Sequence, residues 1–401
     1  MAETGVDRGS VPVLVPQAES FGAVGVIRSL GRAGYPVHAC AESADALGLH
    51  SRWVRSARLQ PSPASEEFLP WVRETVRALG IRAIVPSESF LLGLRPALSE
   101  FRGLLPFFDP SLFEIAFSKA DLMLALEGDE HLPPGVVVEG EVPAVERLAA
   151  LGRPLWLKAD AIHGRNGAPS RVLRVDDPTA ARAELARWLR HYRRVLVQGQ
   201  VPGSGVGIFF LMVNGHPRAR FAHRRLHEVP HTGGVSSFRE SVHYPDIEAH
   251  ALSVLRRIGW NGVAMLEYRR DPATGDFRLL ELNARFWGSL HLALAAGVDF
   301  PRLLLDAWLG GREPEPSWRP GVRCRQTIPG EVRHVWSVLR DGAVPRRDKL
   351  RAVARFAGLG LDPRIHSDLW WPGDRGLAVR EALRWARETG VTLARRARPR
   401  I

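Results

Sequence analysis

Two apolar segments that each carry an acidic residue constrain this chain more than any other feature. Residues 277–288 place Glu281, Asn283 and Arg285 at alternate positions, with leucine or alanine between them. On a strand these three side chains share one face, because successive side chains point to opposite faces. A carboxylate, an amide oxygen and a guanidinium in register suit a hard cation next to a phosphate. An amphipathic edge strand with a solvated polar face is the simpler interpretation of the same residues.

A second acidic segment upstream favours the functional interpretation. Residues 262–268 form an apolar run that contains Glu267, and residues 270–276, rich in Asp, Pro and Gly, separate this run from the first segment. Apolar runs joined by such residues predict a β-hairpin. Antiparallel pairing would bring Glu267 close to Glu281, and two neighbouring carboxylates repel each other unless a cation compensates their charge. We therefore expect a divalent cation at this hairpin.

Lysine use gives an independent indication. Lys and Arg together number 55, yet only Lys119, Lys158 and Lys349 are lysines, so arginine supplies the general surface charge. Lys158 follows a short apolar run and precedes a polar segment that contains Gly164 and Gly167. A lysine before a glycine loop is typical of a phosphate site, which backbone N–H groups of the loop complete. A hairpin turn with an amphipathic lysine that reaches the solvent is the alternative.

The first part of the chain alternates strand-like and helix-like segments. Residues 11–15 and 36–40 are apolar runs, and residues 20–32 between them have helical periodicity. This order predicts a βαβ unit and a parallel sheet, without the G-x-G-x-x-G pattern of dinucleotide-binding proteins. Further on, Ser87 and Glu88 follow another apolar run. Ligands collect at the carboxyl ends of parallel strands, so we expect both residues to contact a substrate, unless Ser87 only caps the next helix.

A polar, glycine-containing segment covers residues 223–236. It carries too many charges for a core and too many donors for a spacer, so we expect a functional loop that offers Arg224 and Arg225 as donors. The alternative is a surface loop whose arginines pair with Glu228 and Glu240. Histidines recur here at every fourth position, but a proline and a glycine pair argue against the helix that would turn them into a zinc site.

Composition limits the classes of partner. The net charge is +12 and the pI is about 10.8. Basic residues are dispersed except in the tail 394–400, and no basic stretch is interleaved with aromatic residues, so nucleic acid is not favoured. Cys40 and Cys324 lack metal-ligand spacing and predict buried thiols. No run approaches the roughly 18 apolar residues of a membrane span, and we expect a cytoplasmic protein without a membrane segment.

The order of these segments resembles the ATP-grasp superfamily, of the carboxylate–amine ligase type and similar to carbamoyl-phosphate synthase and biotin carboxylase. The resemblance covers most of the chain, up to the helix after Arg285. It implies that Lys119 begins the first helix of a nucleotide-binding region and that a glycine lid follows Lys158. It also implies a hinge strand against adenine at residues 195–203. The residues that the resemblance assigns are Lys119, Lys158, Gly164, Gly167, Gln198, Gln200 and Val201 for the nucleotide, Glu267, Glu281 and Asn283 for the metal, and Arg285 and Arg225 for catalysis.

The resemblance also implies a fold and a division into domains. The expected fold class is α/β, of the α+β ATP-grasp type, with a Rossmann-like domain at residues 1–115. A two-lobed ATP-grasp domain at residues 116–312 and a small, mostly helical extension at residues 313–401 would follow. One residue departs from the family pattern, because Gly199 stands where the hinge commonly has glutamate. The ribose contact is therefore unassigned, with Gln198 or Gln200 as replacements.

The function that the resemblance implies is an ATP- and Mg2+-dependent ligase, with Mn2+ as a substitute metal. Such an enzyme converts a substrate carboxylate to an acyl phosphate, joins it to an amine, and releases ADP and phosphate. Its partners would be a small-molecule carboxylate and amine, and a homodimer is left open. The alternatives are an ATP-grasp carboxylase, a phosphotransferase with a non-carboxylate acceptor, and a non-catalytic basic protein that binds nucleotides or nucleic acid.

Overall fold

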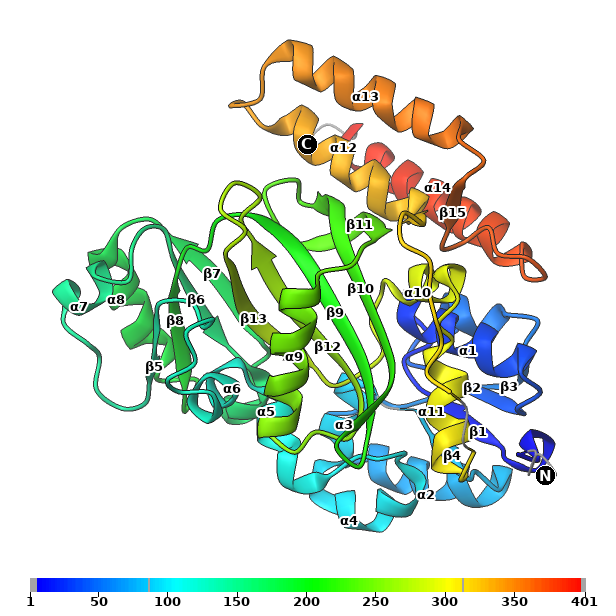
Figure 1. Ribbon diagram of the computed structural model, residues 1–401. Helices are drawn as coiled ribbons and strands as arrows, with labels where there is room; N and C mark the ends of the chain where they lie inside the picture. Colours follow the sequence, from blue (N-terminus) through cyan, green and yellow to red (C-terminus); the bar gives the residue numbers. More distant parts are fainter. Residues whose placement is uncertain (1–5, 86, 312–313, 398–401) are drawn as a thin grey trace.

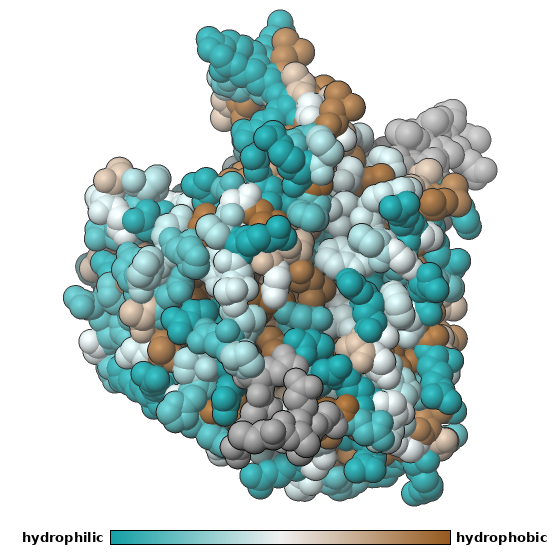
Figure 2. Space-filling view, turned by 45° about the vertical axis from the view of Figure 1, so that its right-hand side comes forward, coloured by the Kyte–Doolittle hydropathy of each residue, from teal (hydrophilic) through white to brown (hydrophobic). Residues whose placement is uncertain are grey.

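The computed structural model describes residues 6–85, 87–311 and 314–397, with side chains up to residue 388. Three β-sheets organise these residues, and helices cover their faces (Figure 1). Helices near the carboxyl terminus project from the body, and Figure 2 shows hydrophobic and hydrophilic residues side by side on this projection. Within the described ranges, no helix combines the length and the apolar character needed to cross a membrane.

The first sheet confirms the predicted βαβ unit. Its four strands are parallel and lie in the order β3-β2-β1-β4. Ser20 begins the first helix as its N-cap, because its side chain accepts a hydrogen bond from Ala23 N at 3.1 Å. The strands are β1 (Val13–Val15), β2 (Val37–Ala41), β3 (Val54–Leu59) and β4 (Ala83–Ile84), and the helices are α1 (Phe21–Arg32), α2 (Phe68–Leu79), α3 (Glu88–Leu94) and α4 (Leu98–Phe101).

The second sheet is antiparallel, in the order β5-β8-β6-β7. It has its own core, in which Leu155 and Leu157 pack with Trp188 and Val197. Side chains alternate between the two faces along β6, so the residue between these two leucines points to the opposite face of the sheet. The elements are β5 (Gly135–Val138), β6 (Leu155–Ala159), β7 (Arg171–Val175), β8 (Val195–Gly199), α5 (Phe113–Phe117), α6 (Lys119–Ala125), α7 (Val145–Ala149) and α8 (Pro178–Trp188).

The third sheet has seven strands, in the order β13-β12-β9-β10-β11-β14-β15. Helices α9 (Pro245–Arg257), α10 (Leu290–Ala296) and α11 (Phe300–Trp308) accompany it. The strands are β9 (Ser204–Val213), β10 (His216–Val229), β11 (Val235–Ser241), β12 (Gly262–Arg270), β13 (Phe277–Asn283), β14 (Arg323–Arg325) and β15 (Ile365–Ser367).

The expectation of a loop over residues 223–236 is wrong at both ends of this segment, because residues 223–229 and 235–236 belong to strands. Residues 223–229 continue β10 and pair with β11. Their charges are compatible with a strand because partners satisfy them: Arg224 lies 2.6 Å from Glu240, opposite it on β11. The Arg224–Glu240 pair is one of the two pairs that the alternative interpretation of the sequence proposes. Only residues 230–234 form a turn.

The part of the chain after residue 313 is mostly helical, and it is joined to the rest by strands and buried ion pairs. Its helices are α12 (Val332–Arg340), α13 (Arg346–Leu361) and α14 (Gly376–Ala397). β14 pairs with β11, so this part completes the third sheet. Arg28 of α1 lies 2.9 Å from Asp374, and Arg239 of β11 pairs with Asp368. The domain boundaries stay a prediction, and the two cysteines are free and buried, as predicted.

Candidate active site

The hairpin of β12 and β13 has the register that the sequence predicts. Glu267 lies directly opposite Glu281 across the two strands. Asn283 shares the face of Glu281, since its Nδ2 donates a hydrogen bond to Glu281 Oε1 at 3.1 Å. Two carboxylates and one amide thus meet on one face of the third sheet.

Each of the two carboxylates has its own cation. Lys119 Nζ lies 3.1 Å from Glu281 Oε2 and 3.2 Å from Asp160 Oδ1. Arg225 of β10 places its Nη2 atom 2.5 Å from Glu267 Oε2. The repulsion between the paired glutamates is therefore balanced by one lysine and one arginine that come from different parts of the chain.

These ion pairs separate the pKa values of the two glutamates. Burial would raise the pKa of Glu281, but the charge of Lys119 and the hydrogen bond from Asn283 outweigh it and lower the pKa to about 2. For Glu267, burial raises the pKa and repulsion from Glu281 adds to it, against the attraction of Arg225. Glu281 is ionised at neutral pH, and Glu267 is the member of the pair that takes up a proton first.

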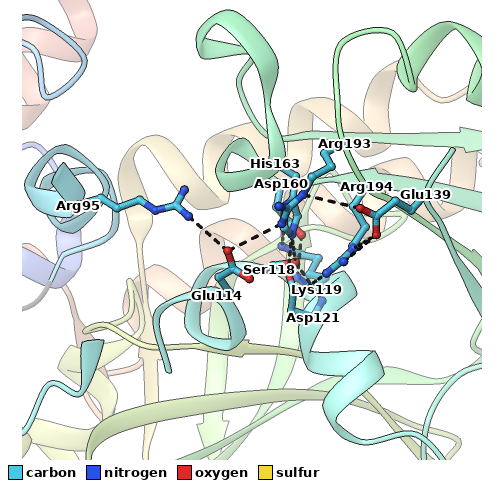
Figure 3. Close-up of polar contacts among 10 residues, drawn as sticks. All are labelled: Arg95, Glu114, Ser118, Lys119, Asp121, Glu139, Asp160, His163, Arg193 and Arg194. Carbon is cyan, nitrogen blue, oxygen red and sulfur yellow. Dashed lines mark hydrogen bonds and ion pairs between the residues drawn. The ribbon is translucent and has the colours of Figure 1, made fainter. Parts of the chain in front are cut away.

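Lys119 is held at the first residue of α6 by contacts from two directions (Figure 3). Ser118 caps the helix by accepting from Asp121 N at 3.0 Å. Asp160, just after β6, accepts from the Lys119 backbone N at 2.7 Å and also contacts its Nζ. Next to them, His163 and Asp121 form a further pair. Asp160 was missed by the sequence analysis, although an acidic residue so close after Lys158 was a usable signal.

Lys158 lies on β6 and is held by the neighbouring strand β8. Its Nζ donates to Gln198 Oε1 at 2.7 Å. Burial disfavours the charged form and lowers the pKa of Lys158 to about 8, against the attraction of Glu281. In the same way, Trp156 Nε1 donates to Gln200 Oε1 at 2.7 Å. Gln198 and Gln200 are thus both oriented by residues of β6.

Gly199 has a structural reason for replacing the hinge glutamate. A Cβ atom at this position would lie 1.9 Å from Leu151 O. No side chain fits between β8 and Leu151, two residues after the end of α7, so the backbone here excludes glutamate.

The charged groups surround a cavity of about 470 Å³, which we call the first cavity. It lies between the second and third sheets, because its walls come from β6, β8, β10, β12 and β13. The predicted residues that line it are Lys119, Lys158, Gln198, Gln200, Val201, Arg225, Glu267 and Glu281. Lining residues that the sequence analysis did not assign include Trp156, Glu228, Thr232, Gly233, Gly234 and Arg269.

The turn at residues 230–234 closes one side of the first cavity and is supported by α12. His231 N donates to Ser337 Oγ at 3.0 Å, and His231 Nε2 lies 3.1 Å from Asp341 Oδ2. Gly234 has a φ of 158°, and a Cβ there would lie 2.1 Å from Val229 O. The glycine pair in the sequence indicates a turn here. It does not indicate that the turn contacts α12.

Two predicted glycines lie apart from the first cavity. Gly164 lies between two short 3-10 turns, Ala161–His163 and Arg165–Gly167, and Gly167 ends the second of them. Both turns lie between β6 and β7, and neither glycine is among the described residues that line the cavity. A Cβ on Gly164 would lie 2.3 Å from Ala168 O, which accounts for a glycine at this tight turn. Their contact with a nucleotide stays a prediction.

Arg285 lines a different cavity, of about 360 Å³, which we call the second cavity. Its Nε donates to Glu88 Oε2 at 2.9 Å. Ser87 also lines this cavity, and although it occupies the N-cap position of α3, its side chain makes no capping hydrogen bond. The structure thus brings Ser87 and Glu88, at the carboxyl edge of the first sheet, to the residue that follows the acidic hairpin. Their contact with a substrate stays a prediction.

Comparisons with known proteins identify the fold. Residues 194–328 match the model of a family described as ATP-grasp in the biosynthetic pathway with Ter operon. No curated protein matches the sequence. Among solved structures, the biotin carboxylase–β-γ-ATP complex from Campylobacter jejuni has a TM-score of 0.58 at 14% identity, with 78% of this chain and 74% of that chain covered.

Two further structures support the same assignment. L-amino acid ligase from Bacillus licheniformis has a TM-score of 0.55 at 16% identity, covering 76% of this chain and 75% of that one. N5-carboxyaminoimidazole synthetase from Staphylococcus aureus, complexed with ADP, has a TM-score of 0.58 at 13% identity, covering 78% and 80%. The predicted fold class is confirmed: the chain shares the fold of these solved structures, and residues 194–328 match an ATP-grasp family model.

Proposed function

We propose that this protein is an ATP- and Mg2+-dependent ligase that joins a small-molecule carboxylate to an amine. The observation that carries the proposal is the pair Glu267 and Glu281, each with its own cation, facing a cavity of about 470 Å³ in an ATP-grasp fold. The similar structures include an amino acid ligase and a carboxyaminoimidazole synthetase, and this supports the proposed class of reaction.

ATP would bind in the first cavity. Lys119 and Lys158 supply positive charge for its phosphates, and the hinge residues Gln198, Gln200 and Val201 face the same space for the adenine. Lys158, with a pKa of about 8, gains a full charge when phosphate oxygens approach, because a nearby anion favours the protonated amine.

The residues of the hairpin fit a divalent metal. Glu267, Glu281 and Asn283 offer the oxygen donors that Mg2+ or Mn2+ prefers, and the two carboxylates now need Lys119 and Arg225 to balance their repulsion. When bound, the metal would neutralise charge on the phosphates. Lys119 and Arg225 would then be released from the carboxylates and become available to phosphate oxygens.

The reaction would proceed in two steps. A carboxylate oxygen attacks the γ-phosphorus, the bond from that phosphorus to the bridging oxygen breaks, and ADP leaves. The amine nitrogen then attacks the carbonyl carbon of the acyl phosphate, the carbon–oxygen bond to phosphate breaks, and the amine loses a proton to solvent. Arg225 and Arg285 would stabilise the phosphoryl charge, and exclusion of water by the bound substrates would protect the acyl phosphate.

An isotope experiment tests the acyl-phosphate step. A carboxylate substrate labelled with 18O, found by a screen for ADP release, should give one labelled oxygen in each released phosphate. ADP release should need both the carboxylate and an amine, and it should continue in buffer free of bicarbonate. Phosphate without label would contradict the ligase, and strict dependence on bicarbonate would indicate a carboxylase.

A further inference from the structure

The second cavity has the size of a small metabolite and lies beside the proposed reaction site. Its volume of about 360 Å³ is at the lower end for ligand pockets. Arg285 at its wall follows β13 and is two residues from Asn283, the last residue of that strand. A ligand bound to Arg285 would therefore lie close to the carboxylates of the first cavity.

The polar groups of the second cavity carry one positive and one negative charge. Arg285 and Glu88 form an ion pair of 2.9 Å, with side chains 32% and 42% exposed, so a ligand can reach both partners. An ion pair this exposed contributes little to stability and is readily exchanged for contacts with a ligand. A dianionic phosphate would meet the carboxylate of Glu88, whereas a ligand with both charges would satisfy each residue.

Two hydroxyl groups in the cavity wall lack a partner inside the protein. Ser87 Oγ and Ser89 Oγ are buried, and neither makes a hydrogen bond within the described part of the chain. Both residues line the second cavity together with Glu88. Buried hydroxyls are normally satisfied, so these two offer unused hydrogen bonds to a ligand.

The rest of the wall is apolar. Val15, Val26 and Val85 are buried residues at the carboxyl ends of β1 and β4 and on α1, and all three line the cavity. Gln17 next to them has a φ of 54°, a left-handed conformation that is uncommon for residues other than glycine. Such backbone outliers concentrate at functional sites. The cavity therefore combines an apolar floor with a rim that carries both charges.

We infer that the second cavity binds the carboxylate substrate as a zwitterion, an α-amino acid with a small apolar side chain. The inference rests on the proposed function. Arg285 and the hydroxyls of Ser87 and Ser89 bind the carboxylate, Glu88 binds the ammonium group, and the valines contact the side chain. Because Glu88 keeps the ammonium protonated, the bound amino acid acts as the acyl donor, and its own amine does not attack.

Binding by the full chain, in the presence of ADP and Mg2+, tests the inference by calorimetry with three probes. L-valine carries both charges, 3-methylbutanoate lacks the ammonium group, and 2-methylpropylamine lacks the carboxylate. We expect L-valine to bind at least about tenfold more tightly than either analogue. Equal affinity for L-valine and 3-methylbutanoate, or no binding of L-valine while ADP binds, overturns the inference.

A variant of Glu88 tests where the ammonium group of the ligand binds. Glu88→Gln should reduce the affinity for L-valine to that for 3-methylbutanoate, whose own affinity should not fall. Glu67→Gln, an equivalent change before α2, should leave the preference intact, because Glu67 is exposed and outside the cavity. An unchanged preference in Glu88→Gln overturns the inference. The three probes on the unaltered chain decide the question if this variant does not fold.

A trapping assay keeps this inference separate from the proposed function. Hydroxylamine converts an acyl phosphate to a hydroxamate, so L-valine, ATP and hydroxylamine should yield valine hydroxamate. L-valine binding without hydroxamate or ADP release contradicts the ligase and supports the zwitterion site. Hydroxamate formed equally well from 3-methylbutanoate supports the ligase and overturns the zwitterion site.

Discussion

The two cavities differ in how their polar groups are satisfied. In the first cavity Glu281 is paired with Lys119, Glu267 with Arg225, and Lys158 is bonded to Gln198. In the second cavity one exposed ion pair stands next to two buried hydroxyls that have no partner in the described chain. The first cavity also has buried nitrogen atoms without a partner in the described chain, Gln198 Nε2 and Arg225 Nε among them, but its charged groups are paired. A charged ligand of the first cavity therefore exchanges existing ion pairs, and its affinity depends on charge and pH. A ligand of the second cavity makes new hydrogen bonds, which is the stronger basis for selecting a substrate.

The largest effect expected is the loss of turnover in Glu281→Gln. This change removes the carboxylate between Lys119 and the proposed metal but keeps the shape of the side chain. The rate of ADP release should fall by about 10³-fold, the upper range for loss of one charged group at a reacting centre. The matched control is Glu240→Gln, which breaks a pair with Arg224 outside both cavities. If Glu281→Gln keeps activity within about twofold of the unaltered chain, the glutamate pair has no role in the mechanism.

The next effect tests whether Arg285 belongs to the second cavity. Arg285→Ala should lower kcat/KM for the carboxylate by about 10²-fold, since a charged partner of the reacting group is lost. The dissociation constant of ADP should stay within about twofold, because Arg285 does not line the first cavity among the described residues. Arg224→Ala is the control variant, and it should change neither kcat/KM for the carboxylate nor the dissociation constant of ADP. A comparable loss of ADP affinity in Arg285→Ala would show that the two cavities act as a single binding site.

A pH effect should distinguish the first cavity from the second. Lys158 has a pKa of about 8 without ligand, so it is mostly protonated at pH 7 and mostly neutral at pH 9. If its charge is needed for phosphate binding, ADP affinity should fall about tenfold over this range. Lys158→Arg should flatten the curve, because arginine stays charged. Titration calorimetry in buffers of different ionisation enthalpy should show proton uptake near pH 8. No uptake, or a curve that Lys158→Arg does not change, would contradict this role.

The smallest effect expected concerns the turn that separates the first cavity from α12. Asp341→Asn weakens the contact with His231, which helps to hold residues 230–234 in place. A partly exposed pair of this kind contributes up to about 1 kcal/mol, so KM for ATP should rise by about two- to fivefold. Asp348→Asn on α13, which breaks a pair with Arg351 on the same helix, is the control. An equal change in both variants would indicate a general effect of charge.

The sequence was sufficient for features that depend on local periodicity. Glu267 opposite Glu281 followed from the alternation of two strands and the turn between them, and the βαβ unit followed from two apolar runs and a helical period. Residues 223–229 misled the prediction because partners on β11 and β12 satisfy their charges, and sequence spacing does not reveal such partners. The bond from Lys158 to Gln198 and the support of Lys119 by Asp160 each join residues about 40 positions apart. Contacts of this range depend on how the sheets pack, and one sequence does not specify them.

The pairing of β14 with β11 has a consequence for how the protein could be shortened. β14 comes after residue 312, yet it covers residues Phe238, Arg239 and Glu240 of β11 along the third sheet. A chain that ended at residue 311 would present this row of unpaired N–H and C=O groups to solvent, together with Arg239 deprived of Asp368. Open sheet edges of this kind serve as templates for aggregation between molecules. The carboxyl-terminal segment therefore also covers an edge of β11 that would otherwise be open to pairing with another molecule.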